Sequence, residues 1–372
     1  MLVGVPKEIK VLEHRVGLTP ASVREVVHHG HQAIVEHGAG DGIGASDDDY
    51  AHAGATIAAT AAEVWAKAQM IVKVKEPQAP ERAMLKPGQM LFTYLHLAPD
   101  PEQTKDLVAS GAVCIAYETV TSPAGGLPLL APMSEVAGRM AVQAGAHYLE
   151  KAHGGKGVLL GGVPGVEPAR VVVLGGGVVG THAITVALGM EADVWVIDRN
   201  VEALRRLWAQ FGPALNTVFS TRDAIERHVE TADLVIGGVL VPGASAPRLV
   251  SRELVSRMER GSVLVDVAID QGGCFETSHP TTHAEPVFAV DGVTHYCVAN
   301  MPGGVPRTST YALNHATLPF VLSLADRGWK KALAADAHLR DGLNVALGKV
   351  SCRPVADAQG YPYVEAAALL GG

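Results

Sequence analysis

Short apolar runs alternate with segments of helical periodicity along most of the chain. Runs rich in Val, Ile and Leu predict strands near residues 4, 34, 71, 91 and 114, and again at 171–174, 193–197, 234–236 and 263–267. Between them, patterns such as PASVREVVHHG, TAAEVWAKA and PEQTKDLVASG predict helices that end at glycine, at proline or at a new strand. Strands that alternate with helices are typical of parallel sheets covered on both faces. We therefore expect an α/β fold.

Two passages rich in proline and glycine divide this alternation. The first, at 121–133, leads into a helix predicted from Ser134 to about Gly154, and the second lies at 301–310. After the second passage the pattern stays helical to about Gly328, and the later segments LPFVLSLADRGWKKALA and LRDGLNVALGKV are also predicted to be helices. We expect a discontinuous domain of residues 1–130 plus 308–372 and an inserted domain of residues 131–307. Both are predicted to be doubly wound and Rossmann-like, with an interdomain cleft.

A glycine loop carries the strongest local signal. The strand VVVL runs directly into Gly175-Gly176-Gly177-Val178-Val179-Gly180, which fits the pattern G-x-G-x-x-G, and a helix and a second strand ending at Asp198 follow. Such a loop alone can be a plain structural turn, but in this context it predicts dinucleotide binding at a helix N-terminus. Asp198 favours NAD over NADP because a carboxylate repels a 2′-phosphate, although Arg199 beside it could receive that phosphate.

Composition excludes several classes of function. Hydrophobic residues make up 48% of the chain and charged residues 18%, with a formal net charge of −8. This balance argues against nucleic acid or an anionic membrane as partner. The apolar stretches fall short of the about 20 residues that span a bilayer, and the N-terminus lacks a signal core. We expect a cytoplasmic protein whose four cysteines are reduced.

Further sequence blocks resemble one family throughout the chain. They are the stretch GVPKEIKVLEHRVGLTPASV, the glycine loop, and VKVKEP, FTYLHLA, APMSEVAGRMA, VDVAIDQGG and VANMPGGVPRTST. Together they resemble the alanine dehydrogenase family, which shares ancestry with the NAD-binding subunit of proton-pumping transhydrogenase. The resemblance covers nearly the whole chain.

The resemblance implies a set of substrate and catalytic residues. Arg15 matches the arginine that holds the substrate carboxylate, and Lys75 matches the lysine that contacts its carboxylate and carbonyl side. His96 matches the acid–base histidine. Asp270 matches an aspartate beside the nicotinamide and the reacting amine or water.

The resemblance also implies a set of positions that contact NAD. Together with the glycine loop they are Ser134, Gly175, Gly177, Val178, Val179, Gly180, Asp198, Ser220, Val239, Leu240, Val267, Ala268, Ile269, Asp270, Val298, Ala299, Asn300 and Met301. The chain departs from the family pattern at Arg199, Ala203 and His279, so the contacts near the adenosine end are the least certain to transfer.

From the residues alone, each candidate has a simpler interpretation. Lys75 could be a solvated lysine at a strand end, and His96 could be a core histidine. Arg15 could pair with Glu8 or Glu13 on the surface. His279 and His283 have a spacing that suggests a metal pair, but Pro280 disfavours a helix there, and we expect no metal site.

The resemblance implies the reversible oxidative deamination of L-alanine to pyruvate and ammonium with NAD as cofactor, in a homohexamer. Three alternatives remain open at this point. They are a related or saccharopine-type amino-acid dehydrogenase, a non-catalytic NAD(H)-binding subunit like that of transhydrogenase, and a nucleotide sensor that has kept the fold without the chemistry.

Overall fold

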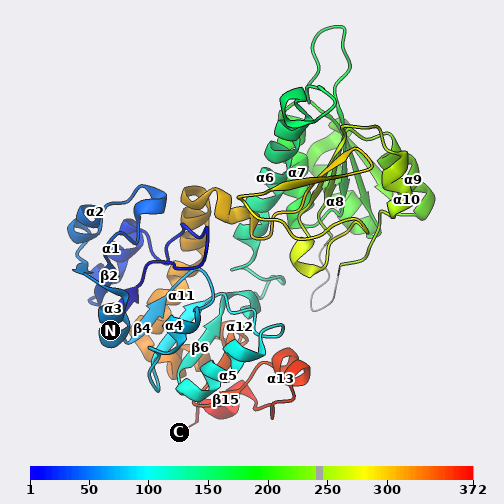
Figure 1. The fold of residues 1–372 in the computed structure, drawn as a ribbon. Helices are drawn as coiled ribbons and strands as arrows, with labels where there is room; N and C mark the ends of the chain where they lie inside the picture. The colour runs from blue at the N-terminus through cyan, green and yellow to red at the C-terminus, as the bar shows by residue number, and fades with distance from the viewer. Residues whose placement is uncertain (240–245, 372) are drawn as a thin grey trace. The chain divides into compact units, whose positions relative to one another are not determined.

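The computed structural model describes residues 1–239 and 246–371. They form two compact units, one of Met1–Met133 with Val305–Gly372 and the other of Ser134–Gly304 (Figure 1). Each unit has its own sheet and its own hydrophobic core. The predicted α/β class with two doubly wound sheets is confirmed.

The sheet of the first unit has the strand order β15-β14-β6-β5-β4-β1-β2-β3. The parallel strands are β1 (Leu2–Val5), β2 (Gln32–Glu36), β3 (Thr56–Ala58), β4 (Met70–Val72), β5 (Met90–Thr93) and β6 (Val113–Ala116). Their order runs outward from β1 in both directions, so the winding reverses between β1 and β4. In sheets of this type, ligands bind beyond the carboxyl ends of the strands at that switch point.

Helices cover the first sheet because its strands are apolar on both faces. On β4, Met70 and Val72 belong to one core cluster and Ile71 to another, which is the alternation that a doubly covered strand requires. The helices begin at side-chain caps such as Thr19 and Asp100. They are α1 (Pro20–His28), α2 (Asp47–His52), α3 (Ala61–Lys67), α4 (Ala79–Arg82), α5 (Pro101–Ser110), α11 (Pro306–Ala335), α12 (Ala337–Arg340) and α13 (Arg353–Gln359).

The prediction of a helix for the segment LRDGLNVALGKV is wrong. Only α12 is helical there, and the segment continues as β14 (Leu343–Ala346) and β15 (Lys349–Val350). β14 pairs antiparallel with β6 and buries all four of its residues, and Leu347 and Gly348 turn the chain with positive φ angles of 53° and 78°. Long-range pairing with β6 therefore outweighs a local pattern that is too short to distinguish strand from helix.

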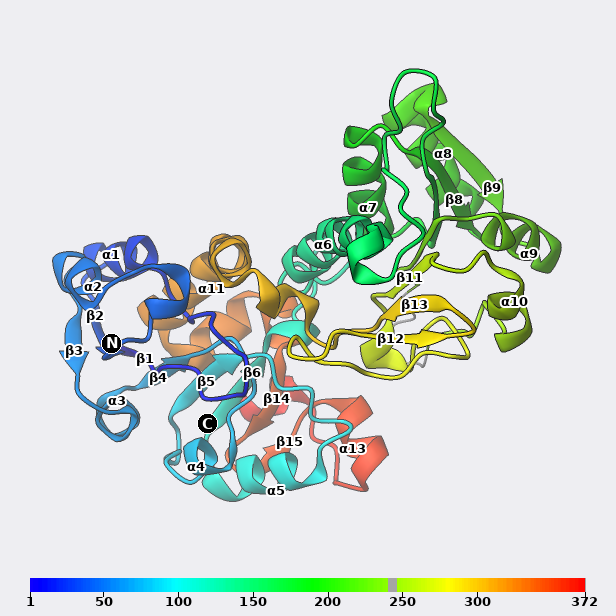
Figure 2. The ribbon, with the colours of Figure 1, turned by 45° about the horizontal axis from the view of Figure 1, so that its top comes forward.

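The second sheet repeats the same winding with the order β12-β13-β11-β10-β7-β8-β9. Its strands are β7 (Arg170–Leu174), β8 (Asp193–Asp198), β9 (Leu215–Phe219), β10 (Leu234–Gly237), β11 (Val263–Asp266), β12 (Val287–Val290) and β13 (Val293–Tyr296). Only β12 pairs antiparallel among these strands, in a hairpin with β13. In Figure 2, β12 and β13 lie side by side. The switch point lies between β7 and β10, where the glycine loop begins.

The helices of the second unit are α6 (Ala131–Leu149), α7 (Val178–Gly189), α8 (Val201–Phe211), α9 (Arg222–Glu230) and α10 (Arg252–Arg257). α6 begins three residues before the predicted start at Ser134 and gives way to a 3₁₀ turn over Lys151–His153, which Gly154 ends with φ 90°. Within the described residues, no helix is both long enough and apolar enough to cross a membrane.

The first turn of α7 packs against the loop that precedes it. A Cβ added to Gly180 would lie 1.8 Å from the carbonyl oxygen of Gly175, a backbone atom that cannot move without opening the loop. At the other end of α7, a Cβ on Gly189 would meet nothing within 4 Å.

These two glycines give a matched test of the loop packing. We expect Gly180→Ala to lower the free energy of unfolding by about 1–3 kcal/mol or more, because overpacking displaces backbone. Gly189→Ala should leave it unchanged or raise it by up to about 1 kcal/mol, because alanine favours the helix. Urea unfolding followed by circular dichroism measures both, and equal effects of the two variants would contradict the close packing described above.

Candidate functional site

The glycine loop of the second unit forms an open cradle at the N-terminus of α7. Gly175 has φ 98°, and its N–H donates to the carbonyl of Ile197 at 2.9 Å. Gly177 is the extended N-cap residue of α7, and a Cβ placed on it would have open space around it. The N–H groups of a first helical turn attract anions. A dinucleotide pyrophosphate therefore fits the residues present here.

Asp198 lies at the end of β8 with its carboxylate turned to this loop. Its two oxygens accept the N–H groups of Gly176 at 2.6 Å and of Asn200 at 2.7 Å. Arg199 is exposed, whereas Arg206 on α8 donates to the carbonyl of Gly176 at 2.8 Å. Arg206 could not be identified from the sequence, because its contact depends on how α8 packs against the loop.

The other predicted cofactor positions follow the strands of the same sheet. Gly175 contacts Val239, since a Cβ on the glycine would lie 3.0 Å from Val239 Cγ2, and Ser220 donates its N–H to the carbonyl of Asp198 at 3.0 Å. Leu240 lies outside the described residues. Val267, Ala268, Ile269 and Asp270 follow β11, while Val298, Ala299, Asn300 and Met301 follow β13. Ser134 is on α6, one turn before Gly138, whose Cα packs against the backbone of Val179.

Asp270 is exposed on a 3₁₀ turn over Ile269–Gln271, just beyond β11. Asp266, the last residue of β11, holds the segment that follows this 3₁₀ turn through hydrogen bonds to its carboxylate. Its buried carboxylate accepts the N–H of Cys274 at 2.8 Å and the hydroxyl of Ser278 at 2.6 Å, and burial raises its pKa. Asp266 has no motif of its own, so the sequence did not identify it.

In the first unit, Arg15 is buried rather than on the surface. Its guanidinium is 2% exposed, and Nε and one terminal nitrogen donate to the two carboxylate oxygens of Glu13 at 2.7 and 2.6 Å. The other terminal nitrogen lies 3.1 Å from Met133 Sδ. Burial lowers the pKa of Arg15, but Glu13 more than offsets this and the net pKa is raised. The surface pairing considered from the sequence is therefore corrected: the partner is Glu13, and the pair is desolvated.

Lys75 follows β4, where the winding of the first sheet reverses. Its N–H donates to Glu8 Oε1 at 3.3 Å, and its carbonyl accepts the hydroxyl of Thr93 at 2.9 Å. Glu8 comes from the loop after β1, the same loop that carries Arg15. The backbone of Lys75 is therefore hydrogen-bonded to the loop after β1 and to the last residue of β5.

His96 has the left-handed backbone conformation, with φ 50°. Its N–H donates to Glu118 Oε1 at 2.6 Å, and that carboxylate also accepts the N–H of Leu95. The ring stacks on Tyr94 with an interplanar angle of 8°, and its side chain is 47% exposed. A core position for His96, considered from the sequence, is therefore wrong. A non-glycine residue at positive φ is strained, and Glu118 holds it there.

Tyr94 and Glu8 relate these three residues to one another. Burial raises the pKa of Tyr94, and the nearby charge of Arg15 opposes the rise. The negative charge of Glu8 raises the pKa of Arg15 and so opposes the effect of burial. Glu8 also accepts the backbone N–H of Lys75. Arg15, Lys75 and His96 lie in the segments that follow β1, β4 and β5, so they share the carboxyl-end edge of three neighbouring parallel strands.

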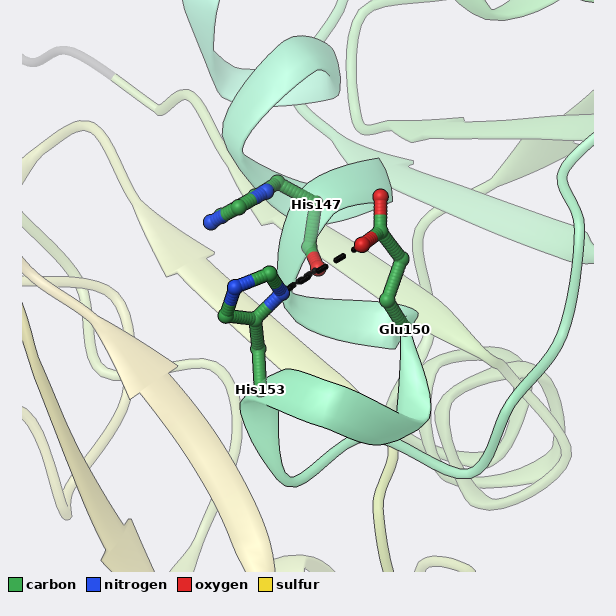
Figure 3. Close-up of side chains that lie close together, drawn as sticks. All are labelled: His147, Glu150 and His153. Atoms are coloured by element: carbon green, nitrogen blue, oxygen red, sulfur yellow. Dashed lines mark hydrogen bonds and ion pairs between the residues drawn. The ribbon is translucent and has the colours of Figure 1, made fainter.

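One further group of polar side chains lies at the end of α6. In the part of the chain that the structure describes, His147, Glu150 and His153 are the one group of at least three whose ligand atoms approach one another as metal ligands do, within 4.8 Å (Figure 3). All three are exposed. His153 Nδ1 lies 3.2 Å from the carbonyl of His147, and the two rings pack together. These contacts are those of a capped helix end, and we assign no metal to them.

The spacing of His279 and His283 suggested a metal pair, but we expected no metal site there. His279 stacks on Phe288, and a ring nitrogen of His283 lies 3.2 Å from the carbonyl of Asn300. The two histidines therefore contact different partners.

The strand order, glycine cradle and strand-end carboxylate define the second unit as a dinucleotide-binding fold of the Rossmann type. Comparison with known proteins shows to which family the whole chain belongs. Residues 4–137 match the family model for the alanine dehydrogenase/PNT N-terminal domain, and residues 141–353 match that for the C-terminal domain.

Proteins named alanine dehydrogenase are similar over the full length. The Halomonas elongata protein is 62% identical with all of both chains covered, and the Bacillus subtilis protein is 53% identical over 98% of this chain and 97% of its own. A solved L-alanine dehydrogenase is 52% identical with a TM-score of 0.94, covering 96% and 99% of the two chains. A transhydrogenase from Sinorhizobium meliloti is 26% identical with a TM-score of 0.83, covering 94% and 100%. The chain belongs to the alanine dehydrogenase/PNT family.

The Glu13–Arg15 pair generates a stability prediction. Glu13→Ala leaves a buried guanidinium without its carboxylate, which should lower the free energy of unfolding by about 3–5 kcal/mol. The matched control is Glu230→Ala, because Glu230 makes an ion pair of 3.4 Å with Arg257 in which both side chains are substantially exposed. The control should leave the urea midpoint almost unchanged. If Glu13→Ala were as mild as Glu230→Ala, the pair would not be desolvated in solution.

Proposed function

We propose that the chain catalyses the reversible oxidative deamination of L-alanine with NAD⁺ and water to pyruvate, ammonium and NADH. The observation that carries this proposal is the full-length similarity to proteins named alanine dehydrogenase. The geometry supports it, because a buried arginine, a lysine and a half-exposed histidine follow three neighbouring strands of the first sheet, β1, β4 and β5. A dinucleotide cradle lies at the switch point of the second sheet.

In this proposal, Arg15 and Lys75 bind the substrate carboxylate. A guanidinium fixed by Glu13 loses little entropy when it binds an anion, and it stays protonated at all relevant pH values. The ammonium of Lys75 adds a second positive charge, and the backbone of Lys75 is hydrogen-bonded at both its N–H and its carbonyl. Two cations that bind the carboxylate orient the Cα of the substrate, and such orientation supplies a large part of catalysis.

His96 is proposed to transfer the protons. Imidazole exchanges protons near neutral pH, and the exposed part of the ring can pass them to solvent. When water adds to the iminium form of the substrate and ammonia leaves, a group must accept and return protons. The ring of His96 stacks on Tyr94, and Glu118 accepts the backbone N–H of His96. These two contacts restrict the positions that the ring can take.

Asp270 is proposed to orient the amine or the attacking water and to offset the positive charge of the iminium. It suits this role because it is exposed at a strand end of the dinucleotide-binding unit. The nicotinamide nucleotide, when bound, accepts or supplies the hydride. The residues that would hold it are the glycine loop, Asp198 and the strand-end positions described above.

We propose NAD rather than NADP as the cofactor because Asp198 presents a carboxylate at the end of β8. Arg199 and Arg206 are the cations that could reverse this choice, but Arg206 already donates to the loop carbonyl of Gly176. Homohexameric assembly and a cytoplasmic location stay predictions. A transhydrogenase-like subunit is not favoured, since the solved transhydrogenase shares 26% identity and the solved L-alanine dehydrogenase 52%. A saccharopine-type dehydrogenase is not favoured, because the full-length relatives at 62% and 53% identity are named alanine dehydrogenase.

The function is tested by NADH oxidation with pyruvate in the presence and absence of ammonium, for the wild-type chain and for His96→Ala. We expect turnover that requires ammonium, and a roughly 10²–10⁴-fold lower turnover in the variant because proton transfer is lost. NADH affinity, measured by fluorescence, should be the same in both proteins. Wild-type protein that does not consume NADH would contradict the function, and a fully active variant would contradict the role of His96.

Cofactor choice is tested by kcat/KM for NADH and NADPH in the wild type, Asp198→Ala and Arg199→Ala. The wild type should prefer NADH, and Asp198→Ala should narrow the preference by about tenfold or more, because one repulsive charge is removed. Arg199→Ala should change little. Equal use of both cofactors by the wild type, together with loss of NADPH activity in Arg199→Ala, would instead identify Arg199 as the phosphate receptor.

A further inference from the structure

Lys73 is fully buried and lies between two carboxylates. Its ammonium donates to Glu8 Oε2 at 2.9 Å and to Glu81 Oε1 at 2.7 Å, and all three side chains are at most 2% exposed. Burial lowers the pKa of Lys73, but the two carboxylates raise it overall, so the lysine stays charged. Apolar residues of similar volume often stabilise a core at least as well as a buried ion pair does. The cluster therefore calls for a role other than stability alone.

Glu8 reaches across the switch point of the first sheet. It follows β1, and its other oxygen, Oε1, accepts the N–H of Val74 at 2.7 Å and that of Lys75 at 3.3 Å. One carboxylate therefore binds the side chain of Lys73 and the backbone of the next two residues. The ammonium of Lys73 fixes Glu8 from one side, and Glu81, which also caps α4 by accepting the N–H of Gln78 at 2.8 Å, fixes Lys73 from the other.

The opposite side of the same segment is bound to the residues at the end of β5. The N–H of Lys73 donates to the carbonyl of Phe92 at 3.2 Å, and the N–H of Tyr94 donates to the carbonyl of Val74 at 3.2 Å. The hydroxyl of Thr93, which is fully buried, completes this edge at the carbonyl of Lys75. Lys75 is thus held at its N–H by Glu8 and at its carbonyl by Thr93, on opposite sides of one strand end.

We propose that Glu8, with Lys73 as its fixed counter-ion, is a positioning residue that sets the backbone of Lys75 and thereby the place of its ammonium in the substrate site. The inference rests on the proposed function, because it takes Lys75 as a ligand of the substrate carboxylate. Glu8 acts through hydrogen bonds from its Oε1 and touches neither substrate nor cofactor. A merely structural cluster would affect stability without changing the affinity for the substrate.

The test compares steady-state kinetics and thermal midpoints of the full-length wild type, Glu8→Leu, Glu8→Gln and Lys156→Met. Glu8→Leu removes the acceptor at similar size, whereas Glu8→Gln keeps an oxygen for the N–H groups of Val74 and Lys75. Lys156 is the matched control, because in the other unit it also binds two carboxylates, Asp233 at 2.6 Å and Glu259 at 2.5 Å. The quantities measured are KM for pyruvate, KM for NADH and kcat.

We expect Glu8→Leu to raise the KM for pyruvate by about tenfold or more with the KM for NADH unchanged, because a misplaced Lys75 weakens carboxylate binding. Glu8→Gln should recover most of the wild-type KM. Lys156→Met should lower the thermal midpoint and leave both KM values unchanged. If Glu8→Leu lowered the midpoint like the control and left the pyruvate KM at the wild-type value, the cluster would be structural only and the proposal would be overturned.

Thr93→Val keeps the test decisive if Glu8→Leu does not fold. Valine has nearly the shape of threonine but cannot donate to the carbonyl of Lys75, so the pyruvate KM should rise while the fold is kept. An unchanged KM would overturn the proposal. Lys75→Ala, measured in the same series, distinguishes the substrate role of Lys75 from the positioning role of Glu8. If Lys75→Ala leaves the pyruvate KM unchanged, the substrate role of Lys75 fails. If only Lys75→Ala raises it, the positioning role of Glu8 fails alone.

Discussion

Charged groups removed from water need partners, and this constraint organises the first unit around the end of its central strands. Arg15 and Lys73 are almost completely buried, and Glu13, Glu8 and Glu81 supply the matching carboxylates. The two ion pairs of Lys73 link the end of β4 to the loop after β1 and to α4, so these segments cannot move independently without separating buried charges. The Glu13–Arg15 pair lies within the loop after β1 and fixes the guanidinium there. A guanidinium held in this way is a preorganised receptor for a small anion.

The two sheets share the same winding but carry different side chains beyond their strand ends, and these suit different ligands. In both, the strand order runs outward in two directions from the first strand of the unit, which opens a crevice beyond the strand ends. The second unit lines that place with glycine and with the N–H groups of α7, which suits a pyrophosphate whose charge is met by dipoles. In the first unit, the proposed substrate ligands Arg15 and Lys75 follow β1 and β4, and two cations suit a small carboxylate. Val239, which lies beside Gly175, follows β10, and Glu8, which accepts the N–H of Lys75, follows β1. Each comes from the strand next to the one that its partner follows.

How much of this could be predicted from the sequence depends on how local each feature is. The glycine loop and Asp198 form one continuous strand–helix–strand signal, and the structure places them together. The partnership of Glu8 with Lys73 joins residues 65 positions apart, and no spacing rule indicates it. The burial of Arg15, the left-handed backbone of His96 and the strand β14 likewise depend on how distant segments pack. The family resemblance supplied Arg15, Lys75 and His96 by position, and the sequence also offered Glu13 as a partner of Arg15. The carboxylates that hold the backbone of Lys75 and of His96, Glu8 and Glu118, came only from the structure.

The proposed reaction is one hydride transfer to the Cα of a 2-oxo acid in the presence of ammonium, with the carboxylate bound by the first unit and the nicotinamide nucleotide by the second. Its most direct test is to incubate the protein with pyruvate, ammonium and NADH deuterated at nicotinamide C4 on the transferred face, and to analyse the product by mass spectrometry and NMR. The account predicts L-alanine that carries one deuterium at Cα. Deuterated lactate, or alanine without deuterium at Cα, would contradict it.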